Sequence, residues 1–550
     1  MKIIIFALIP LILSIGISPV IPFSDASEPN QICINKVWIE NTKGKFACVT
    51  PSTADKLVER GWGTILAEDA FEEKPEMKEL EAGQEIIETR IGTLELQSDY
   101  LTSETAQKLK DELFFQRAIQ VYHLTLPAVA TAGIFYEQDK VGATTGDILY
   151  WSEPMTSDVE ILTGNISVLY LISQQTLSDG PIVVDEPAGT ILGHIDNLYQ
   201  QPLSDLGAPG PHEGNGGLIL ILPPNYDEEI PEGYTVFQSD TMQITILARS
   251  FINDGDKDAA EQVVKELNIY KLSESDNPPQ AKFVDLAGVS IKMAHPTTEG
   301  FWKFLHEVYS EESIIRNEDK NLVGLMHSIG IVPGEPFEPD AHSKKLLGEA
   351  AIIANLMTKG VAYDNPAKEH YVFYPGKNWE APFMTKIADF ENELGATQIE
   401  ARLGYVYQAI TVADAMILKL EGKGSKYLAT YRDADENFLD GSNTYLLNIP
   451  TDVPAERFWS VVVYDADTRS MIKNDMQSLP GIRSLDADTL VQNDDGSYDV
   501  YFGPEAPKGY ENNWVKTNEG DGWFVLFRFY SPSAEYYEKN WQLPMIEKIE

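Results

Sequence analysis

Phe458-Trp459-Ser460-Val461-Val462-Val463-Tyr464 is a continuous run of aromatic and β-branched residues, which is the composition of a buried β-strand. A second run of this kind, Trp523-Phe524-Val525-Leu526-Phe527-Arg528, follows near the C-terminus. Between them, Asn493-Asp494-Asp495-Gly496 is a turn signal that directly precedes another short strand pattern. Short strands separated by turns predict an antiparallel β-sandwich over residues 425–550.

The same pattern occurs in the first half of the chain. Short apolar runs lie at Pro181-Ile182-Val183-Val184, Leu218-Ile219-Leu220-Ile221-Leu222 and Ile244-Thr245-Ile246-Leu247, and clusters of Pro, Gly, Asn and Asp separate them. This spacing favours a sandwich or barrel over alternating βαβ units. We predict a first β-rich domain over residues 89–255.

The middle of the chain has a helical period instead. Phe301, Phe304, Leu305 and Val308 form one apolar face, and they predict a mostly helical connecting region over residues 256–424. The fold class that we expect is therefore α+β, mainly antiparallel β, with two β-sandwich domains joined by a helical segment. A similar period begins at Ser103 and predicts a further helix that ends before Pro127.

The N-terminus has the pattern of a secretory signal. Lys2 precedes an apolar run over residues 3–22, and Ser24-Asp25-Ala26 fits the small-x-small site of signal peptidase. We predict a signal peptide over residues 1–26 and an exported protein, which is extracellular, periplasmic or pseudoperiplasmic. The run is close to the ~20 residues that span a bilayer, so the alternative is an uncleaved segment that anchors the protein to a membrane.

The chain contains two cysteines, Cys33 and Cys48, in one short polar stretch. In an exported protein this arrangement is best interpreted as one local disulfide, and a pair of free thiols is the alternative. Closing a loop of that size is worth ~3 kcal/mol in the chain-entropy model. We predict a small disulfide-closed module over residues 27–66, followed by an acidic linker or exposed helix over residues 67–88.

The composition of the 550-residue chain limits the partners that it can have. The formal net charge is -43, and 43% of the residues are hydrophobic, which is ample for packed cores. Binding of DNA or RNA draws most of its affinity from Lys and Arg that neutralise phosphates. We therefore expect no nucleic acid as a partner.

Common catalytic and cofactor motifs are absent from the sequence. It has no His-Glu-x-x-His, no Gly-x-Ser-x-Gly, no Walker loop and no dinucleotide glycine fingerprint. Its eight histidines include no pair at metal-ligand spacing. We predict no cofactor and assign no metal-ligating residues.

One acidic segment has a partial calcium-loop pattern. Asp433-x-Asp435-x-Asn437 with Asp440 places oxygen ligands at alternating positions, as calcium loops do. The EF-hand version fails, because Phe438 replaces the turn glycine and Thr444 occupies the position of the bidentate Glu. A polar hairpin on an acidic surface is favoured over calcium binding.

Aromatic and polar residues of the C-terminal domain form the first candidate ligand site. Trp and Tyr rings with Asn, Asp and Arg beside them suit neutral polar ligands such as sugars. The alternative is a core of large aromatic side chains, with Arg528 paired to Asp465 or Asp467. The candidate ligand-binding residues of this domain are Arg432, Asp433, Trp459, Tyr464, Asn513, Trp514 and Arg528.

A second candidate pocket lies in the N-terminal β-rich domain. Its residues are polar and lie in or beside the predicted strands: Asn165, Tyr170, Asp196, Asp205 and Arg249. The alternative is that these side chains are buried and cap turns. Asn165-Ile166-Ser167 also fits a glycosylation acceptor.

Longer sequence patterns resemble two known families. Segments such as Asp205-Leu206-Gly207-Ala208-Pro209-Gly210-Pro211 and Ile221-Leu222-Pro223-Pro224-Asn225-Tyr226 are similar to the domain of unknown function numbered 1254. Tyr464-Asp465-Ala466-Asp467-Thr468 and Arg528-Phe529-Tyr530-Ser531-Pro532 are similar to its usual partner, domain 1214. The resemblance spans roughly residues 89 to 547 and leaves the cysteine module outside. It implies an exported bacterial- or archaeal-type protein with jelly-roll-like β-domains and no established reaction.

Two classes of function are consistent with these patterns. The first is an exported binding or structural protein. Its expected ligand is a polar small molecule or sugar, and a homo-oligomer is compatible with this class. The second is a secreted hydrolase, acting on glycosidic bonds with two carboxylates drawn from Asp196, Asp205, Asp433 or Asp465, because such hydrolysis needs an acid and a base or nucleophile and leaves no linear motif.

Overall fold

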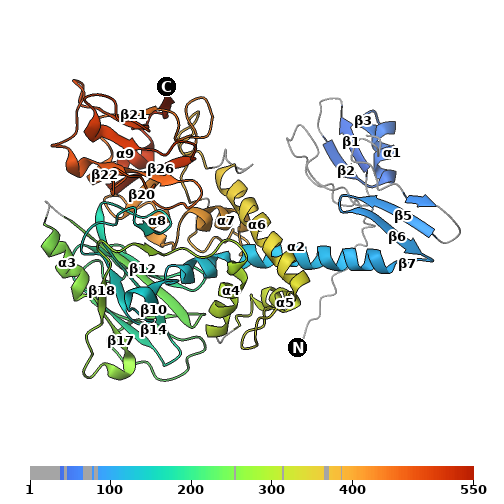
Figure 1. The fold of residues 1–550 in the computed structure, drawn as a ribbon, viewed down its shortest axis with the longest axis horizontal. Helices are drawn as coiled ribbons and strands as arrows, with labels where there is room; N and C mark the ends of the chain where they lie inside the picture. Colours follow the sequence, from blue (N-terminus) through green and yellow to red (C-terminus); the bar gives the residue numbers. More distant parts are fainter. Residues whose placement is uncertain are drawn as a thin grey trace, which may run out of the picture. The chain divides into compact units, whose positions relative to one another are not determined.

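The structure is a computed structural model that describes residues 37–41, 46–65, 77–79, 84–252, 256–312, 315–364, 371–383, 385 and 387–549. The chain divides into two compact units, Met1–Lys110 and Asp111–Glu550 (Figure 1). The predicted signal peptide and Cys33 lie outside the described residues, as does the side chain of Cys48.

The first unit contains two small sheets. Helix α1 has Pro51 in its first turn, where the missing N–H group costs nothing, and it buries Ala54 against Ile39 and Val49. Within the predicted acidic linker, the structure has β4 and the start of β5, which belong to an antiparallel sheet of order β4-β5-β6-β7. The elements are β1 (Val37–Asn41), β2 (Phe46–Val49), α1 (Pro51–Glu59), β3 (Gly63–Ile65), β4 (Met77–Glu79), β5 (Gln84–Thr89), β6 (Gly92–Gln97) and β7 (Tyr100–Leu101).

Helix α2 (Ser103–Gly133) leads into the second unit and continues beyond Pro127, where the sequence predicts its end. Tertiary packing outweighs the local penalty of proline, because Ala128 and Val129 are fully buried around it. Among the described residues, Ser103–Val141 is the one segment whose length and hydropathy would suit a membrane span. Its apolar 18-residue stretch is 83% buried inside the protein.

Among the described residues, the N-terminal β-rich domain has a six-stranded and a four-stranded sheet, and β9 (Val159–Glu160) with β19 (Ile291–Lys292) forms a separate parallel pair. The six-stranded sheet has the order β13-β12-β16-β10-β8-β18, and the four-stranded sheet has the order β15-β14-β11-β17. Most neighbours are antiparallel, but β14 with β15 and β8 with β18 are parallel. The strands are β8 (Ile148–Tyr150), β9 (Val159–Glu160), β10 (Val168–Thr176), β11 (Ile182–Glu186), β12 (Ile191–Asn197), β13 (Pro202–Gly207), β14 (Gly217–Leu222), β15 (Thr235–Gln238), β16 (Gln243–Phe251), β17 (Asn268–Lys271), β18 (Phe283–Asp285) and β19 (Ile291–Lys292).

This domain extends past residue 255, where the period of the sequence changes. Strands β17 and β18 pair with β11 and β8, although they follow helix α3 (Lys257–Glu266). One apolar cluster fills the space between the two sheets, with Leu171 and Ile246 from one sheet and Val184 and Ile219 from the other.

The C-terminal β-rich domain also has two sheets, of order β20-β26-β22-β23 and β25-β24-β21-β27. Val461 and Phe527 of the first sheet share a buried cluster with Leu447 and Val500 of the second. The predicted α+β class with mainly antiparallel sheets is confirmed. The elements are β20 (Ser425–Thr430), β21 (Tyr445–Ile449), β22 (Ala455–Asp465), β23 (Gly481–Arg483), β24 (Tyr498–Gly503), β25 (Trp514–Lys516), β26 (Trp523–Pro532), α9 (Ala534–Glu538) and β27 (Glu547–Lys548).

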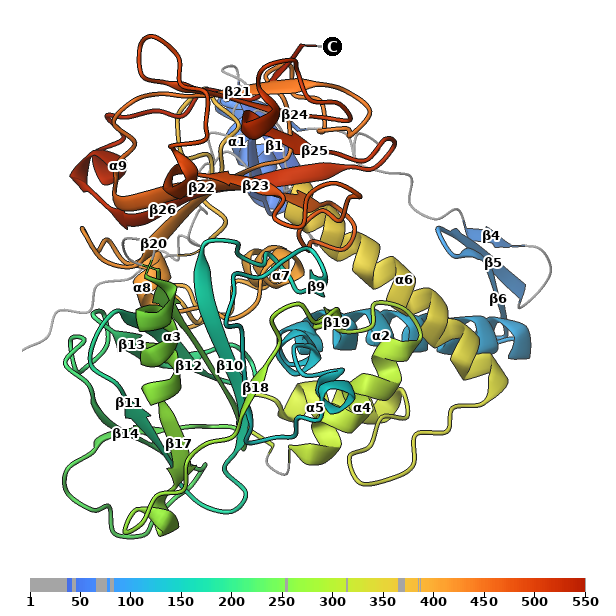
Figure 2. The ribbon, with the colours of Figure 1, turned by 60° about the vertical axis from the view of Figure 1, so that its left-hand side comes forward.

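Helices between the two β-rich domains pack around α2 (Figure 2). Tyr122 of α2 stacks on Phe301 of α4, with ring centres 3.9 Å apart, and both side chains are fully buried. Ala351 of α6 and Val406 of α7 lie in the same cluster. The helices are α4 (Gly300–Glu311), α5 (Lys320–Ser328), α6 (Ala341–Tyr363), α7 (Ile399–Gln408) and α8 (Asp414–Ile417).

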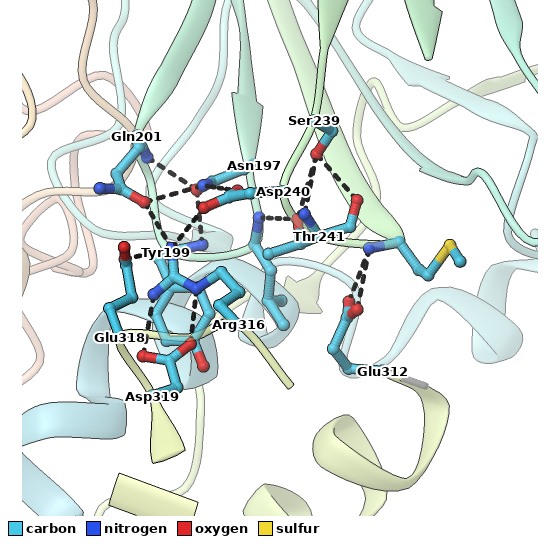
Figure 3. Close-up of polar contacts among 12 residues, drawn as sticks. Asn197, Tyr199, Gln201, Ser239, Asp240, Thr241, Glu312, Arg316, Glu318 and Asp319 are labelled. Carbon is cyan, nitrogen blue, oxygen red and sulfur yellow. Dashed lines mark hydrogen bonds and ion pairs between the residues drawn. The ribbon is translucent and has the colours of Figure 1, made fainter. Parts of the chain in front are cut away.

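A polar cluster joins these helices to the end of the six-stranded sheet (Figure 3). Arg316 pairs with Asp319 at 2.5 Å and Asp240 at 2.8 Å, and its guanidinium lies 3.8 Å from the ring centre of Tyr199. The carboxylate of Glu312 accepts hydrogen bonds from the backbone N–H groups of Met242 and Gln243, at the start of β16. Charge therefore ties the loop before α5 to the strand ends.

The two β-rich domains meet through the outer faces of their sheets, as both ribbon views show (Figures 1 and 2). Phe251 of β16 packs against Phe458 and Tyr530 of the C-terminal domain, with ring centres 6.2 and 6.0 Å away. Ile172 and Leu247 share a second buried cluster with residues of β22 and β26. A cavity lies beside this contact, between the two facing sheets.

Candidate functional site

A cavity of about 110 Å³ that opens to solvent lies between the two facing sheets, Pro382, Phe383 and residues 405–416. Apolar side chains make up most of its wall, including Leu247, Phe383 and Leu526. A few polar groups in an apolar wall are typical of small-molecule sites.

Strand alternation explains which residues line the cavity. Successive side chains of a strand point to opposite faces of a sheet. On β16, Ile246 and Ala248 fill the core of the N-terminal domain, whereas Leu247 and Arg249 line the cavity. The same alternation places Tyr170 of β10 on the cavity side.

Arg249 lies at the centre of this wall. Its Nη1 donates to the hydroxyl of Tyr170 at 3.3 Å, its Nη2 donates to Ser425 Oγ at 3.3 Å, and its buried Nε has no partner. Burial lowers the pKa of Arg249, but the nearby tyrosines, first among them Tyr427, raise it by more, so the group stays cationic.

Arg528 approaches from the opposite sheet and is 3% exposed. Its Nη1 donates to the hydroxyl of Tyr464 at 2.5 Å, and its Nη2 donates to the carbonyl oxygens of Thr163 and Gly164 at 2.8 and 3.2 Å. Its Nε is also buried without a partner. Among the described residues, no carboxylate lies within ion-pair distance of Arg528 or Arg249.

Tyr170 lies beside both guanidinium groups. Its hydroxyl accepts the hydrogen bond from Arg249, and Asn165 Nδ2 lies 3.5 Å from it. Burial raises the pKa of Tyr170, but Arg249 and Arg528 together lower it by more, so the pKa falls below its usual value. The tyrosine hydroxyl therefore ionises more readily than an ordinary phenol.

Two threonines in the wall have left-handed backbone conformations. Thr163 has a φ of 47° and Thr411 a φ of 58°, which β-branched residues rarely adopt. The carbonyl of Thr163 accepts a hydrogen bond from Arg528, and the N–H of Thr411 donates to Gln200 Oε1. Strain of this kind clusters at ligand-binding sites.

Asp205 and His194 line another part of the cavity. Asp205 Oδ2 accepts from the N–H of Ala415 at 3.1 Å, whereas Oδ1 is buried without a partner. Burial raises the pKa of Asp205 to about 6. Burial and the charge of Arg249 lower the pKa of His194 to about 3, so the imidazole is neutral. Its Nε2 also lacks a hydrogen-bond partner and lies 3.8 Å from Asp196 Oδ2.

Lys426 lies behind this wall and is 6% exposed. Its Nζ donates to the carbonyl oxygens of Ala415, Met416 and Leu418 at 2.7 to 3.1 Å. Burial lowers the pKa of Lys426 to about 8, and the charge of Asp205 opposes that shift. Lys426 therefore supplies a positive charge near Asp205, although it does not line the cavity.

The structure divides the predicted C-terminal site between two faces of one sheet. Trp459 and Tyr464 are five residues apart on β22, so they point in opposite directions. Trp459 stacks on Phe527 in the core of the C-terminal domain. Tyr464 points toward the cavity side and holds Arg528 there, so Arg528 pairs with a hydroxyl and not with Asp465 or Asp467.

The other predicted residues of the C-terminal domain lie away from the cavity. Trp514 is 5% exposed and donates from Nε1 to Gly503 O, and Asn513 is fully buried and bonded to backbone groups of Val491. Arg432 pairs with Asp364 at 2.9 Å.

Asp433 serves the turn of the partial calcium-loop pattern. It is 1% exposed, and its Oδ1 accepts from the backbone N–H groups of Asp435 and Asn437 at 3.0 and 2.9 Å. The side chain is thus used by its own turn, as in a polar hairpin.

The predicted N-terminal pocket lies largely in one place. Asn165, Tyr170, Asp205 and Arg249 all line the cavity, whereas Asp196 is fully buried and is not among the lining residues. The amide of Asn165 is 2% exposed and bonded to Tyr530 at 2.8 Å, so it is not accessible as a glycosylation acceptor.

His194, Tyr405 and Tyr427 also line the cavity, and no sequence pattern predicts them there. His194 and Asp205 face each other across β12 and β13, and Tyr427 lies opposite Arg528 across β20 and β26. Knowledge of which residues pair across these strands would have identified them. The sequence contains no local pattern that gives this pairing.

Comparisons with known proteins identify two families and no activity. Residues 145–271 match the family described as protein of unknown function DUF1254, and residues 424–534 match the family described as protein of unknown function DUF1214. The predicted families and their order along the chain are confirmed. No curated protein matches the chain significantly.

Two solved structures are similar to the chain. The VPA0106 protein from Vibrio parahaemolyticus is 17% identical, with 80% of this chain and 100% of that chain covered and a TM-score of 0.47. A putative uncharacterized protein from Burkholderia cenocepacia is 9% identical, with 82% and 90% covered and a TM-score of 0.36.

Proposed function

The chain pairs an N-terminal DUF1254 domain with a C-terminal DUF1214 domain, and we propose that it binds an amphipathic organic anion in the cavity between them. One observation carries this proposal: Arg249 and Arg528 are buried in the cavity wall without a carboxylate partner. A buried charge that lacks a counter-charge costs several kcal/mol, so a site that keeps two of them gains most from an anionic ligand.

The geometry of the donors supports a carboxylate as the anionic group. A guanidinium has five N–H donors, and within the protein Arg249 makes two hydrogen bonds and Arg528 makes three. The remaining donors suit a planar carboxylate, which accepts parallel hydrogen bonds. The apolar wall favours a ligand with a hydrocarbon body.

An amphipathic anion fits this cavity better than the sugar that the aromatic residues predict. Sugar sites use stacking aromatic rings with many hydrogen-bonding groups, but no Trp is among the described lining residues. Trp459 and Trp514 are core residues of the C-terminal domain.

Calorimetric titration with hexanoate, octanoate and decanoate tests the proposal, with the corresponding uncharged amides as matched ligands. We expect the carboxylates to bind and to raise the melting temperature, because a ligand that binds the native state stabilises it. Amides that bind as tightly as the acids would overturn the proposal.

Variants connect the binding to the two arginines. Arg249→Met and Arg528→Met should each weaken carboxylate binding by about tenfold or more, since hydrogen bonds to charged groups are worth ~1.5–3 kcal/mol. Arg432→Met is the matched control, because Arg432 is outside the cavity and paired with Asp364. Its affinity should equal that of the wild type.

A secreted hydrolase is the second candidate, and one observation favours it. Asp205 lines the cavity with a pKa raised to about 6, which suits a general acid. A glycosidase needs a second carboxyl across the substrate, and Asp205 is the one carboxylate among the described lining residues. Release of nitrophenol from nitrophenyl glycosides and esters, lost in Asp205→Asn, would support this candidate over a binding protein.

The same proposal includes the expected export and disulfide. The apolar N-terminal run and the isolated pair Cys33 and Cys48 support both. Protein recovered from outside the cytoplasm should begin at Ser27, and its mass without reduction should be lower than that of the dithiol form by two hydrogen atoms. We also propose that the paired sheets are jelly-roll sandwiches, which is supported by the apolar cluster inside each pair.

A further inference from the structure

Asp205 and His194 form a second polar position in the cavity wall, apart from the two arginines. They are direct neighbours across β13 and β12, and the next residue in the same cross-strand row is the apolar Leu247 of β16. Asp205 Oδ1 and His194 Nε2 are buried and have no hydrogen-bond partner among the described residues. His194 is 5% exposed. Unpaired buried polar atoms of this kind call for a ligand or water.

The sheet register separates this position from Arg249. Arg249 lies in the adjacent cross-strand row, opposite Leu192 on β12 and Tyr170 on β10. Strands lie about 4.8 Å apart and rise about 3.4 Å per residue, so the backbones of Asp205 and Arg249 are about 12 Å apart. Leu247 and Leu192 lie between them. One elongated molecule can therefore contact both ends, with its apolar body along the leucines.

From this arrangement we propose that Asp205 and His194 recognise a hydroxyl group on the ligand, at the end remote from its carboxylate. The proposal rests on anion binding at Arg249 and Arg528, and it specifies the ligand class as hydroxy-carboxylic acids with an apolar middle. Asp205 Oδ1 accepts the hydrogen bond of the hydroxyl, and the neutral imidazole beside it adds a further polar contact.

A neutral hydroxyl fits this position better than an ammonium group. Lys426 lies close enough to lower the pKa of Asp205, against the larger effects of burial and Asp414, so the carboxylate already has one cation beside it. Asp196, next to His194, has a pKa raised well above its usual value by burial, with Asp205 and Asp414 adding to that rise, so it supplies no second negative charge. The charge of Arg249 lowers the pKa of His194, so it disfavours a second cation at this position as well. An ammonium ion would lose its hydration in an apolar wall for little gain.

Matched ligands test this inference in the full chain. For each chain length, the alkanoate, the ω-hydroxyalkanoate and the acid with a terminal methyl ketone are titrated calorimetrically. We expect the hydroxyl to increase wild-type affinity by about tenfold at the best chain length, which corresponds to one buried hydrogen bond. The ketone, which only accepts hydrogen bonds, should bring no gain.

Asp205→Asn reverses the chemistry of the position at constant shape. The N–H of Ala415 needs an acceptor, so the amide oxygen of Asn turns to it and the NH₂ group replaces Oδ1. We expect the variant to bind the ketone more tightly than the wild type does and to gain less from the hydroxyl. Arg249→Met is the complementary variant, which weakens all three ligands equally and keeps the hydroxyl gain.

The outcomes separate this inference from the proposed function. If plain alkanoates do not bind, anion binding itself fails. If they bind but the hydroxyl adds nothing at any chain length, or adds as much in Asp205→Asn as in the wild type, the inference about Asp205 is overturned. Far-ultraviolet circular dichroism and a melting curve establish that each variant is folded before titration.

Discussion

Arg249 and Arg528 differ from the ion-paired arginines of the chain in what balances their charge. Arg402 and Arg469 also donate to carbonyl oxygens, but they are not among the residues that line the cavity. Arg316 has three carboxylates within 3.0 Å, and Arg432 and Arg483 each have one within 2.9 Å. The two cavity arginines have hydroxyl and carbonyl oxygens instead. Such neutral partners satisfy donors but leave the charge uncompensated, which is why these two residues define the site.

Tyr170 provides a pH signature of anion binding. In the free protein its pKa lies below its usual value because of Arg249 and Arg528, in spite of burial. A bound carboxylate disfavours the ionised phenol and raises that pKa, so by linkage octanoate affinity should fall as pH rises through the pKa of Tyr170. Calorimetry and tyrosinate absorbance from neutral to alkaline pH measure both effects. Tyr170→Phe should remove this fall, and an equal fall in both proteins would contradict the assignment.

Asp205 makes stability depend on pH. Burial raises its pKa from 3.8 to about 6, so the folded protein binds this proton more tightly than the unfolded chain does. Its favourable contribution is fully present below pH 3.8 and is lost as pH rises through 6. Asp205→Asn should therefore be more stable than the wild type at pH 7.5 by on the order of 2 kcal/mol, and nearly equal to it near pH 4. Urea unfolding at both pH values measures this, and an equal difference at both would refute it.

At the scale of elements, alternation along strands decides what each polar residue can do. On β26, Phe527 and Phe529 fill the C-terminal core, whereas Leu526, Arg528 and Tyr530 face the other domain. Trp459 and Tyr464 are five residues apart, and side chains an odd number of residues apart on one strand point to opposite faces of the sheet. The sequence alone therefore excludes a site that both side chains line. Which of the two faces is open could not be read from the sequence, because both consist of large apolar residues.

The cluster around Arg316 fixes the helices to the sheet. Arg316→Ala leaves Asp319 and Asp240 without their counter-charge and should cost ~3–5 kcal/mol of unfolding free energy. Lys303→Ala is the control, because the pair of Lys303 with Glu307 is exposed, at 80% and 51%. It should change stability by less than ~1 kcal/mol. Urea unfolding followed by Trp fluorescence compares them, and similar losses in both variants would contradict a specific role of Arg316.

At the scale of the whole second unit, the cavity exists because two domains share buried surface. Phe458 of the C-terminal domain stacks on Tyr530 at 4.0 Å and meets Phe251 of the N-terminal domain. Buried aromatic residues that cross a domain boundary couple the stability of both sides. We therefore expect residues 111–550 to unfold as one cooperative unit.

Phe458→Ala tests this coupling. The truncation should cost ~3–5 kcal/mol and lower a single calorimetric transition of the second unit, because it opens a hole between both domains. Phe438→Ala is the matched control, since Phe438 is 50% exposed, and its effect should stay within ~1 kcal/mol. Two transitions, of which only one moves, would show that the domains unfold independently.

Local patterns in the chain were enough to establish the α+β class, the short antiparallel strands, the helix period near Phe301 and the two families, because these depend on residues close in sequence. The cavity depended on contacts between distant segments: the amide of Asn165 bonds the hydroxyl of Tyr530, 365 residues away. Candidate residues could be named from the sequence, but only packing of the two sheets determined that Arg249 and Arg528 line one cavity from opposite sheets while Trp514 lies in a core. Register and domain packing are set by the sum of many weak apolar contacts, which no local motif records.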